Sequence, residues 1–313
     1  MNFFLFCFIA GGAVFALICA LLVIAALYVR IFNRSIPAPP LWIDSDEEPR
    51  FKDWSLTPPT MRPFDYASDD TTVDLSLVIP AYNEELRLPE TLKKYYAYLE
   101  SKREQSTTHF TFEILVVDDG STTDGTSIVA EDFARDHPGT VRVLRLLANR
   151  GKGGAVKRGV MCARGKKILF ADADAATEIA DVDAFVQAID NGGADIAIGS
   201  RTVERDSLRQ ILANGFSFLV SVLCVRGIRD TQCGFKMLTR KAARELFPGM
   251  HVERWAFDAE LLYLAQHRGM KIKEIPVHWH EVPGSKLSPV LAAIQMARDL
   301  LRIRLMYRLG IWN

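Results

Sequence analysis

The chain has 313 residues, and its 38 Lys and Arg balance 38 Asp and Glu, so its formal net charge is zero. A neutral chain has no global attraction to polyanions, and we expect no nucleic-acid partner. The 49% hydrophobic content is enough for a sizeable core in one large or two ordinary domains. Its five cysteines show no CxxC or zinc-ligand spacing, which fits a reducing compartment and no structural metal cage.

The N-terminal segment is uncharged and apolar up to Val29. A membrane helix needs about 20 such residues, so we predict a transmembrane anchor at residues 1–30. Arg30 and Arg34 follow the run while no Lys or Arg precedes it, which places the rest of the chain in the cytosol by the positive-inside rule. A cleaved signal peptide, which would have a basic start, and a buried core helix are the alternatives.

Residues 31–73 are rich in proline and acidic side chains and carry no apolar period, which predicts a linker or loosely packed arm. Apolar runs then alternate with helical patterns. We predict strands at 75–80, 112–117, 141–147, 167–171 and 196–199, and helices at 88–100, 126–135, 153–163 and 182–189. Such alternation predicts an α/β domain at 74–286 with a mostly parallel sheet, which binds ligands beyond the carboxyl ends of its strands.

Carboxylates follow three of these strands: Glu84 after the first, Asp118 and Asp119 after the second, and Asp172 and Asp174 after the fourth. Each taken singly is typical of a turn or a helix cap. Together on one sheet edge they would repel each other unless a cation or a basic neighbour compensates. Asp172 and Asp174, two residues apart, can face one Mg²⁺ or Mn²⁺, since these hard ions prefer oxygen ligands and bridge to substrate phosphates.

Residues 149–159, NRGKGGAVKRG, form a basic glycine-rich loop that enters a helix. Free N–H groups at a helix N-terminus and the charges of Arg150 and Lys152 favour an anion. Val156 stands where the dinucleotide pattern needs its third glycine, and the P-loop pattern is also absent. Hydride-transfer and P-loop chemistry are therefore disfavoured.

The runs VIPAYNE, VVDDGSTTDGT, NRGKGGAVKRG, DADAAT, GSR and DTQCGFK, within residues 75–286, resemble glycosyltransferase family 2 with its GT-A fold. They are most similar to the eukaryotic dolichyl-phosphate β-glucosyltransferases. The resemblance implies inverting transfer of glucose from UDP-glucose to dolichyl phosphate, giving dolichyl β-D-glucosyl phosphate and UDP for protein N-glycosylation. It also implies a single-pass protein of the endoplasmic reticulum membrane with a cytosolic catalytic domain.

The resemblance also implies roles for individual residues. Asp172 and Asp174 would form the DXD-type metal site. The residues expected to bind the nucleotide-sugar or a phosphate are Pro80, Tyr82, Glu84, Asp118, Asp119, Arg150, Lys152, Asp172, Arg201 and Lys286. The catalytic set is Asp172, Asp174, Arg201 and Asp258, with a surface salt bridge as the alternative for Arg201.

Asp258 would act as a base only for a neutral hydroxyl acceptor, since a phosphate monoester, with a second pKa of about 6, arrives ionised. Otherwise Asp258 and Glu260 orient sugar hydroxyls or basic side chains, or lie on a helix surface.

Two later segments bear on a lipid partner. Residues 215–225 are apolar but too short to span a bilayer, so they are buried or dip into the interface. Residues 287–313 carry Leu, Ile and Met at helical spacing together with Arg298, Arg302, Arg304 and Arg308. This predicts a basic amphipathic helix on the membrane surface, with a helix packed on the body as the alternative.

Three other functions remain as alternatives. A dolichyl-phosphate or polyprenyl-phosphate mannosyltransferase using GDP-mannose would keep the same fold. A processive polysaccharide synthase is disfavoured, because the chain has no second long apolar span and His251 stands where a QxxRW motif needs Gln. An inactive membrane-tethered sugar-nucleotide binder is disfavoured because both Asp172 and Asp174 are retained. The sequence leaves the choice of sugar and the oligomeric state open.

Overall fold

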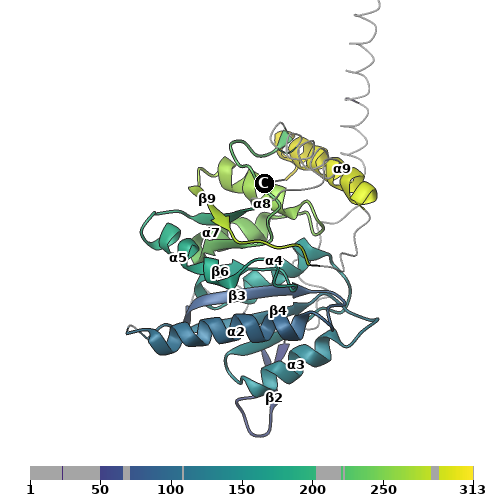
Figure 1. Ribbon diagram of the computed structural model, residues 1–313. Helices are drawn as coiled ribbons and strands as arrows, with labels where there is room; N and C mark the ends of the chain where they lie inside the picture. The colour runs from purple at the N-terminus through teal and green to yellow at the C-terminus, as the bar shows by residue number, and fades with distance from the viewer. Residues whose placement is uncertain are drawn as a thin grey trace, which may run out of the picture. The chain divides into compact units, whose positions relative to one another are not determined.

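The structure is a computed structural model that describes residues 50–65, 71–107, 109–201, 223–282 and 289–312, together with Val23 and Val220 (Figure 1). The chain divides into two compact units, residues 1–44 and 45–313, and the second is described below. No helix of the described part is long and apolar enough to cross a membrane. Apart from Val23, the anchor predicted at 1–30 lies outside the described residues.

A seven-stranded mixed sheet forms the centre of this unit, in the order β5-β4-β3-β6-β8-β7-β9. Its strands are β3 (Val73–Ala81), β4 (Phe112–Asp118), β5 (Val141–Arg145), β6 (Gly165–Phe170), β7 (Ile196–Arg201), β8 (Lys236–Thr239) and β9 (Ile272–Val277). β5, β4, β3 and β6 are parallel, β8 is antiparallel to both its neighbours, and β9 is parallel to β7. The predicted α/β class with a mostly parallel mixed sheet is confirmed.

Helices flank this sheet. They are α2 (Leu88–Gln105), α3 (Thr126–Asp136), α4 (Lys152–Cys162), α5 (Val182–Asp190), α7 (Arg240–Leu246), α8 (Phe257–His267) and α9 (Pro289–Arg308), with short 3₁₀ turns η1 (Ile179–Asp181) and η2 (Phe247–Gly249). The four predicted helices correspond to α2, α3, α4 and α5, and each begins within one residue of its predicted start. The five predicted strands correspond to β3, β4, β5, β6 and β7.

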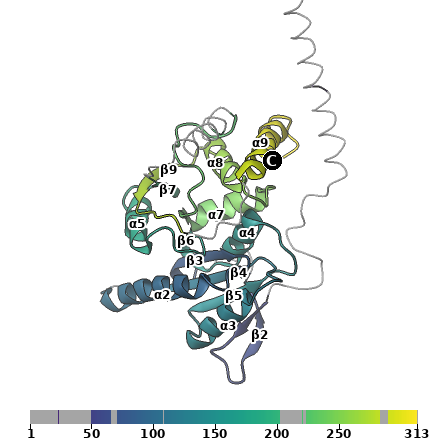
Figure 2. The ribbon, with the colours of Figure 1, turned by 45° about the vertical axis from the view of Figure 1, so that its right-hand side comes forward.

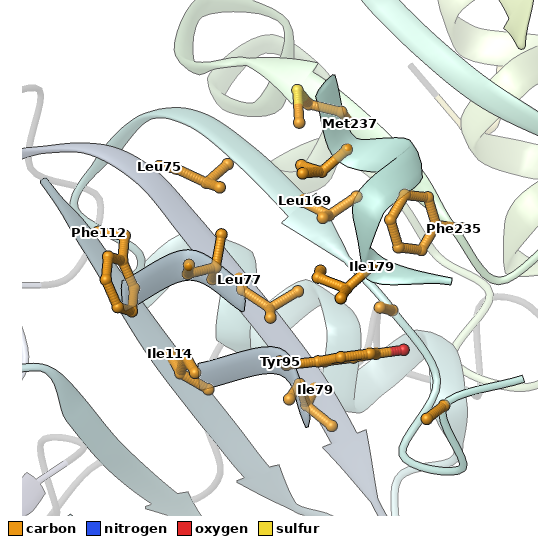
Figure 3. Close-up of a cluster of buried hydrophobic side chains, with 14 of the residues drawn as sticks. Leu75, Leu77, Ile79, Tyr95, Phe112, Ile114, Leu169, Ile179, Phe235 and Met237 are labelled. Atoms are coloured by element: carbon orange, nitrogen blue, oxygen red, sulfur yellow. The ribbon is translucent and has the colours of Figure 1, made fainter. Parts of the chain in front are cut away.

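Both faces of the central strands are buried because successive side chains along a strand point to opposite faces. Leu75, Leu77 and Ile79 of β3 belong to the core cluster shared with α2, α3 and α5, and Figure 3 shows Leu77 and Ile79 close to Ile114 of β4 and Tyr95 of α2. Val78 faces the other side, where Gly159 of α4 lies against it so closely that a Cβ would overlap. Because helices cover both faces of the sheet, a ligand can approach the central strands only at their ends.

Part of the region predicted as a loose linker is folded. β1 (Arg50–Asp53) and β2 (Thr60–Pro63) pair antiparallel. The guanidinium of Arg142 on β5 lies 5.1 Å from the Phe51 ring and 4.7 Å from the buried Phe64 ring. This hairpin corrects the linker prediction for residues 50–65. Its prolines lie in the turn and at a strand end, where no ladder hydrogen bond is lost.

The C-terminal helix α9 packs against the body with one face. Leu300, Ile303 and Met306 are buried, and α9 lies beside α8 (Figure 2). Leu301 and Leu309 on the same helix are about half exposed. Body packing is therefore observed for one face, while contact of the other face with a membrane stays a prediction.

Of the apolar segment at 215–225, the structure describes only Val220 and residues 223–225. Val220, Cys224 and Val225 are buried, and the Cys224 thiol lies 3.5 Å from the Leu300 carbonyl of α9. At these positions the segment is buried in the protein, which agrees with the prediction of burial and not with that of a segment dipping into the membrane interface.

Candidate active site

A cavity of about 450 Å³ opens at the carboxyl ends of β3, β4 and β6. It is lined by Pro80, Ala81, Tyr82, Glu84, Arg87, Asp119, Asn149, Gly151, Lys152, Ala155, Asp172, Ala173, Asp174, Arg254, Trp255 and Val282. Seven of the residues predicted to bind the nucleotide-sugar or to act in catalysis are therefore brought together: Pro80, Tyr82, Glu84, Asp119, Lys152, Asp172 and Asp174. Their meeting place is the sheet edge at which ligands of parallel α/β folds bind.

The two acidic residues at the end of β4, Asp118 and Asp119, have different positions. The Asp119 carboxylate accepts hydrogen bonds from the backbone N–H groups of Arg150 and Gly151, both at 2.8 Å. Burial raises the pKa of Asp119 to about 6, although these two hydrogen bonds favour the ionised form. Asp118 is also buried, does not line the cavity, and accepts a hydrogen bond from the Ser121 N–H at 3.0 Å. Asp118 therefore shapes the turn, and only Asp119 faces the cavity.

Glu84 lies beside a cation that the sequence analysis did not identify. The Arg87 guanidinium donates two hydrogen bonds to the Glu84 carboxylate, at 2.6 and 2.5 Å, and lies 3.7 Å from Asp174. The i,i+3 spacing of Glu84 and Arg87, just before α2 begins, was the available signal. Arg87 thus links the end of β3 to the acidic pair after β6.

Asp172 and Asp174 follow β6 and both line the cavity. Burial alone would raise the pKa of Asp172. The Lys152 ammonium, 2.5 Å from its Oδ1, together with Lys236 and Arg201 outweighs burial, and the pKa is lowered. For Asp174, burial and the nearby Asp172 charge raise the pKa. Gly234 lies against Asp172 so closely that a Cβ would overlap its carboxylate, which gives the run DTQCGFK a structural reason for its glycine.

These two carboxylates fit a divalent cation. The described residues contain no cluster of three or more His, Cys, Asp or Glu that could hold a metal ion by themselves. Mg²⁺ and Mn²⁺ are commonly held by one or two carboxylates together with substrate phosphates. Besides burial, repulsion by Asp172 raises the pKa of Asp174, and a bound cation would relieve that repulsion.

The glycine-rich loop differs from its prediction. Lys152 lines the cavity, but the Arg150 side chain pairs with Glu253 at 3.8 Å and does not line it. A Cβ at Gly153 would lie 2.5 Å from Cβ of Phe257. The Gly154 N–H, at the start of α4, donates to the Glu253 carbonyl at 2.8 Å. At these positions glycine allows close packing of residues 252–257, and the phosphate contact expected of Arg150 stays a prediction.

Two other predicted catalytic residues are in ion pairs outside the cavity lining. Arg201 makes a bidentate contact with Asp230, at 2.7 and 2.9 Å. Asp258 is buried and pairs with the fully buried Lys236 at 2.5 Å. The helix-surface alternative for Asp258 and Glu260 is wrong, since both are buried. Asp258 instead orients a basic side chain, as the other alternative stated.

The sequence analysis missed Arg254 and Trp255 as cavity residues, although both stand just before the run FDAE at the start of α8. Both are exposed. Arg254 has no acidic partner among the residues that the structure describes, whereas Lys152 and Arg87 are both paired with carboxylates. Lys286 lies outside the described residues.

Comparison with known proteins identifies the family. The family described as "Glycosyl transferase family 2" matches residues 76–247. Dolichyl-phosphate beta-glucosyltransferase of Drosophila melanogaster is 45% identical over 312 residues, covering 93% of each chain. The Homo sapiens protein of that name is 49% identical, covering 78% of this chain and 79% of its own.

Solved structures share the fold. Glucosyl-3-phosphoglycerate synthase from Mycobacterium tuberculosis, in complex with Mn²⁺, UDP-glucose and phosphoglyceric acid, has a TM-score of 0.54 at 18% identity, covering 76% of this chain and 80% of that one. The same enzyme with Mn²⁺, UDP and glucosyl-3-phosphoglycerate has a TM-score of 0.52. This likeness confirms the GT-A type of α/β fold. The chain belongs to glycosyltransferase family 2, with the relatives named dolichyl-phosphate β-glucosyltransferases.

Proposed function

We propose that this chain transfers glucose from UDP-glucose to dolichyl phosphate and inverts the anomeric carbon, giving dolichyl β-D-glucosyl phosphate and UDP for protein N-glycosylation. The observation that carries the proposal is the cavity in which Asp172, Asp174 and Lys152 meet the end of β3, in a chain whose relatives have this name over most of their length.

The donor would lie along the carboxyl ends of β3 and β4. Pro80, Tyr82 and the Asp119 carboxylate would contact the uridine and ribose, and their position in the cavity lining supports this role. Asp172 and Asp174 would hold Mg²⁺ or Mn²⁺ beside the diphosphate, and the bound ion would neutralise charge on the departing UDP. Lys152, already in contact with Asp172, adds a fixed positive charge that requires no reorganisation during the reaction.

A phosphate acceptor requires a cationic side chain to bind it and no general base to deprotonate it. A phosphate monoester has a second pKa of about 6 and is ionised at neutral pH, so its oxygen can attack the anomeric carbon without proton removal. The buried Asp258, paired with Lys236, is poorly placed to act as a base. Arg254, exposed at the cavity with no acidic partner in the described part of the chain, is the residue that we assign to the acceptor phosphate. Catalysis then consists of positioning the two substrates and stabilising the leaving diphosphate.

We further propose that residues 1–30 anchor the chain in the endoplasmic reticulum membrane with the catalytic unit in the cytosol, and that α9 contributes a membrane-facing surface. The uncharged run followed by Arg30 and Arg34 supports the anchor and its orientation. The exposed Leu301 and Leu309 support the membrane-facing surface of α9, because apolar side chains are stabilised when a lipid interface removes them from water.

The test uses membranes that carry the full chain, dolichyl phosphate and Mn²⁺. Radiolabelled UDP-glucose should yield a lipid-extractable glucosyl phosphate, and labelled GDP-mannose should yield none above background. Transfer from GDP-mannose alone would assign the chain to the mannosyl reaction. Binding of UDP-glucose without lipid-extractable product would indicate a binder instead of an enzyme. Membranes with Asp174→Asn serve as the inactive reference.

A further inference from the structure

The segment that carries Arg254 and Trp255 is held by one buried carboxylate. This segment, residues 250–256, joins η2 to α8, and its exposed end lines the cavity. Glu260 on the first turns of α8 is fully buried. Its carboxylate accepts hydrogen bonds from the His251 N–H at 2.9 and 3.0 Å and from the Val252 N–H at 2.6 Å. The carboxylate thus fixes the backbone two residues before Arg254.

The side of the segment that faces α4 is held by other contacts. Lys157 donates to the Met250 carbonyl at 2.8 Å, and the Gly154 N–H donates to the Glu253 carbonyl at 2.8 Å. Arg158 contacts the Glu253 carboxylate at 3.0 Å. The segment is therefore attached to the glycine-rich loop on one side and to Glu260 on the other.

The C-terminal helix reaches the same carboxylate. The Tyr307 hydroxyl on α9 donates its proton to Glu260 Oε1 at 2.8 Å, and its oxygen lies 3.3 Å from the Gly249 carbonyl. Burial and the Glu260 charge raise the pKa of Tyr307, so the phenol keeps the proton that it donates. The Trp312 ring stacks on His251, with centroids 4.3 Å apart and planes inclined by 1°. Two side chains from the end of the chain thus contact the segment that forms a cavity wall.

We propose that Glu260 and Tyr307 are positioning residues of the transferase. Through these two residues α9 fixes the position of the Arg254–Trp255 segment, so that the active site depends on α9. A buried carboxylate that loses one donor must recover it from another group, and the neighbouring backbone shifts when it does. The displaced segment would carry Arg254 away from the acceptor phosphate. The part of the inference that concerns the acceptor rests on the proposed function; the coupling of α9 to the segment does not.

The test is Tyr307→Phe in the full chain, which keeps the aromatic ring and removes the hydroxyl. We expect amide exchange at His251 and Val252 to be accelerated about tenfold, since a hydrogen bond to a charged group contributes about 1.5 kcal/mol. KM for dolichyl phosphate should rise by a similar factor, while KM for UDP-glucose changes less than about twofold, because Asp119 and Lys152 are untouched.

The matched control is Tyr263→Phe. Its ring on α8 packs 5.1 Å from that of Tyr307, while Glu260 accepts no hydrogen bond from it within the described structure. Exchange and both KM values should remain at wild-type levels. If Tyr307→Phe fails to fold, Trp312→Leu, which removes the stacking on His251, takes its place with the same readouts.

Unchanged exchange at 251–252 in the folded variant would overturn the inference, as would an equal rise in both KM values. A wild-type chain that transfers no glucose to dolichyl phosphate would refute the proposed function instead. In that case accelerated exchange at 251–252 would still support the coupling, and unchanged exchange would refute it as well.

Discussion

The two halves of the sheet differ in the surroundings of the charged side chains near their strand ends. In the parallel half, β5-β4-β3-β6, the acids and bases that follow the strands line a cavity, as Asp119, Asp172 and Asp174 do. In the half formed by β8, β7 and β9 with α8, the corresponding charges are paired away from it, as in Lys236–Asp258 and Arg201–Asp230. The first set is available to a ligand, while the charges of the second set neutralise each other within the fold.

This difference has a physical origin. A fully buried charge is tolerated only when it is paired or accepts several hydrogen bonds, whereas a charge beside a solvent-filled cavity keeps part of its hydration. Substitutions in the second half should therefore reduce the stability of the fold. Substitutions of the cavity residues in the first half should reduce activity and leave the fold intact. The buried Glu113–Arg142 pair of β4 and β5 lies away from the cavity and follows the rule for paired charges instead.

The largest effect is expected for Lys236→Met, which leaves Asp258 buried without its partner. Losing one member of a buried ion pair typically costs about 3–5 kcal/mol of unfolding free energy. Urea denaturation of the catalytic unit would measure this loss. The double variant Lys236→Met/Asp258→Leu should recover most of the stability; a double variant as unstable as the single one would contradict the pairing argument.

Asp174→Asn tests the cavity half. We expect transfer to fall by about 10²–10³-fold, the usual cost of removing one group that stabilises the reacting charge. The thermal midpoint should be unchanged, because Asn can still accept the hydrogen bond from the Ala176 N–H, 3.1 Å from Asp174 in the wild type. Asp183→Asn, which alters a surface pair with Lys102, is the control and should retain full activity. Full activity of Asp174→Asn would refute the metal assignment.

The exposed arginines of α9 should affect membrane binding and little else. Arg298 and Arg308 are exposed, and the Arg298 side chain keeps 72% of its accessible surface. Each basic residue near an anionic surface contributes about 1 kcal/mol, so Arg298→Gln/Arg308→Gln should weaken binding by about 30-fold. Cosedimentation of residues 45–313 with phosphatidylserine vesicles would measure this, with neutral vesicles as the control. Equal binding of both forms would argue that α9 does not face the membrane.

The smallest effect is a pH dependence due to Asp119. Its folded-state pKa of about 6 lies above the value of an exposed carboxyl, so the folded state binds the proton more tightly than the unfolded state. That contribution to stability is present at low pH and is lost as the pH rises through about 6. The advantage of the wild type over Asp119→Asn should therefore shrink by about 1 kcal/mol between pH 5 and pH 7. An advantage that grows with pH would show that hydrogen bonding dominates instead.

Much of the parallel half could be predicted from the sequence. Its strands are short apolar runs, and its cavity residues stand directly after them, so alternation and position were sufficient for Asp119, Asp172 and Lys152. The prediction failed where contact partners are distant in the chain. Nothing local distinguishes Arg150, which turns to Glu253, from Lys152, which enters the cavity.

The hairpin at 50–63 was missed for a related reason. Its strands are four residues each and carry few apolar side chains. They are stabilised by contacts with Arg142, about 80–90 residues further along the chain, and such contacts leave no periodic signal in the sequence.

By itself, the sequence determined the order of strands and helices in the parallel half, the sheet edge where carboxylates collect, and the family, because all three depend on short segments read in place. Only the tertiary structure decided which charges face a ligand and which neutralise each other. It also decided that Arg254 and Trp255 form a cavity wall and that Tyr307 contacts the carboxylate behind it. Burial and pairing depend on residues far apart in the chain, and the packing of the whole unit brings them together.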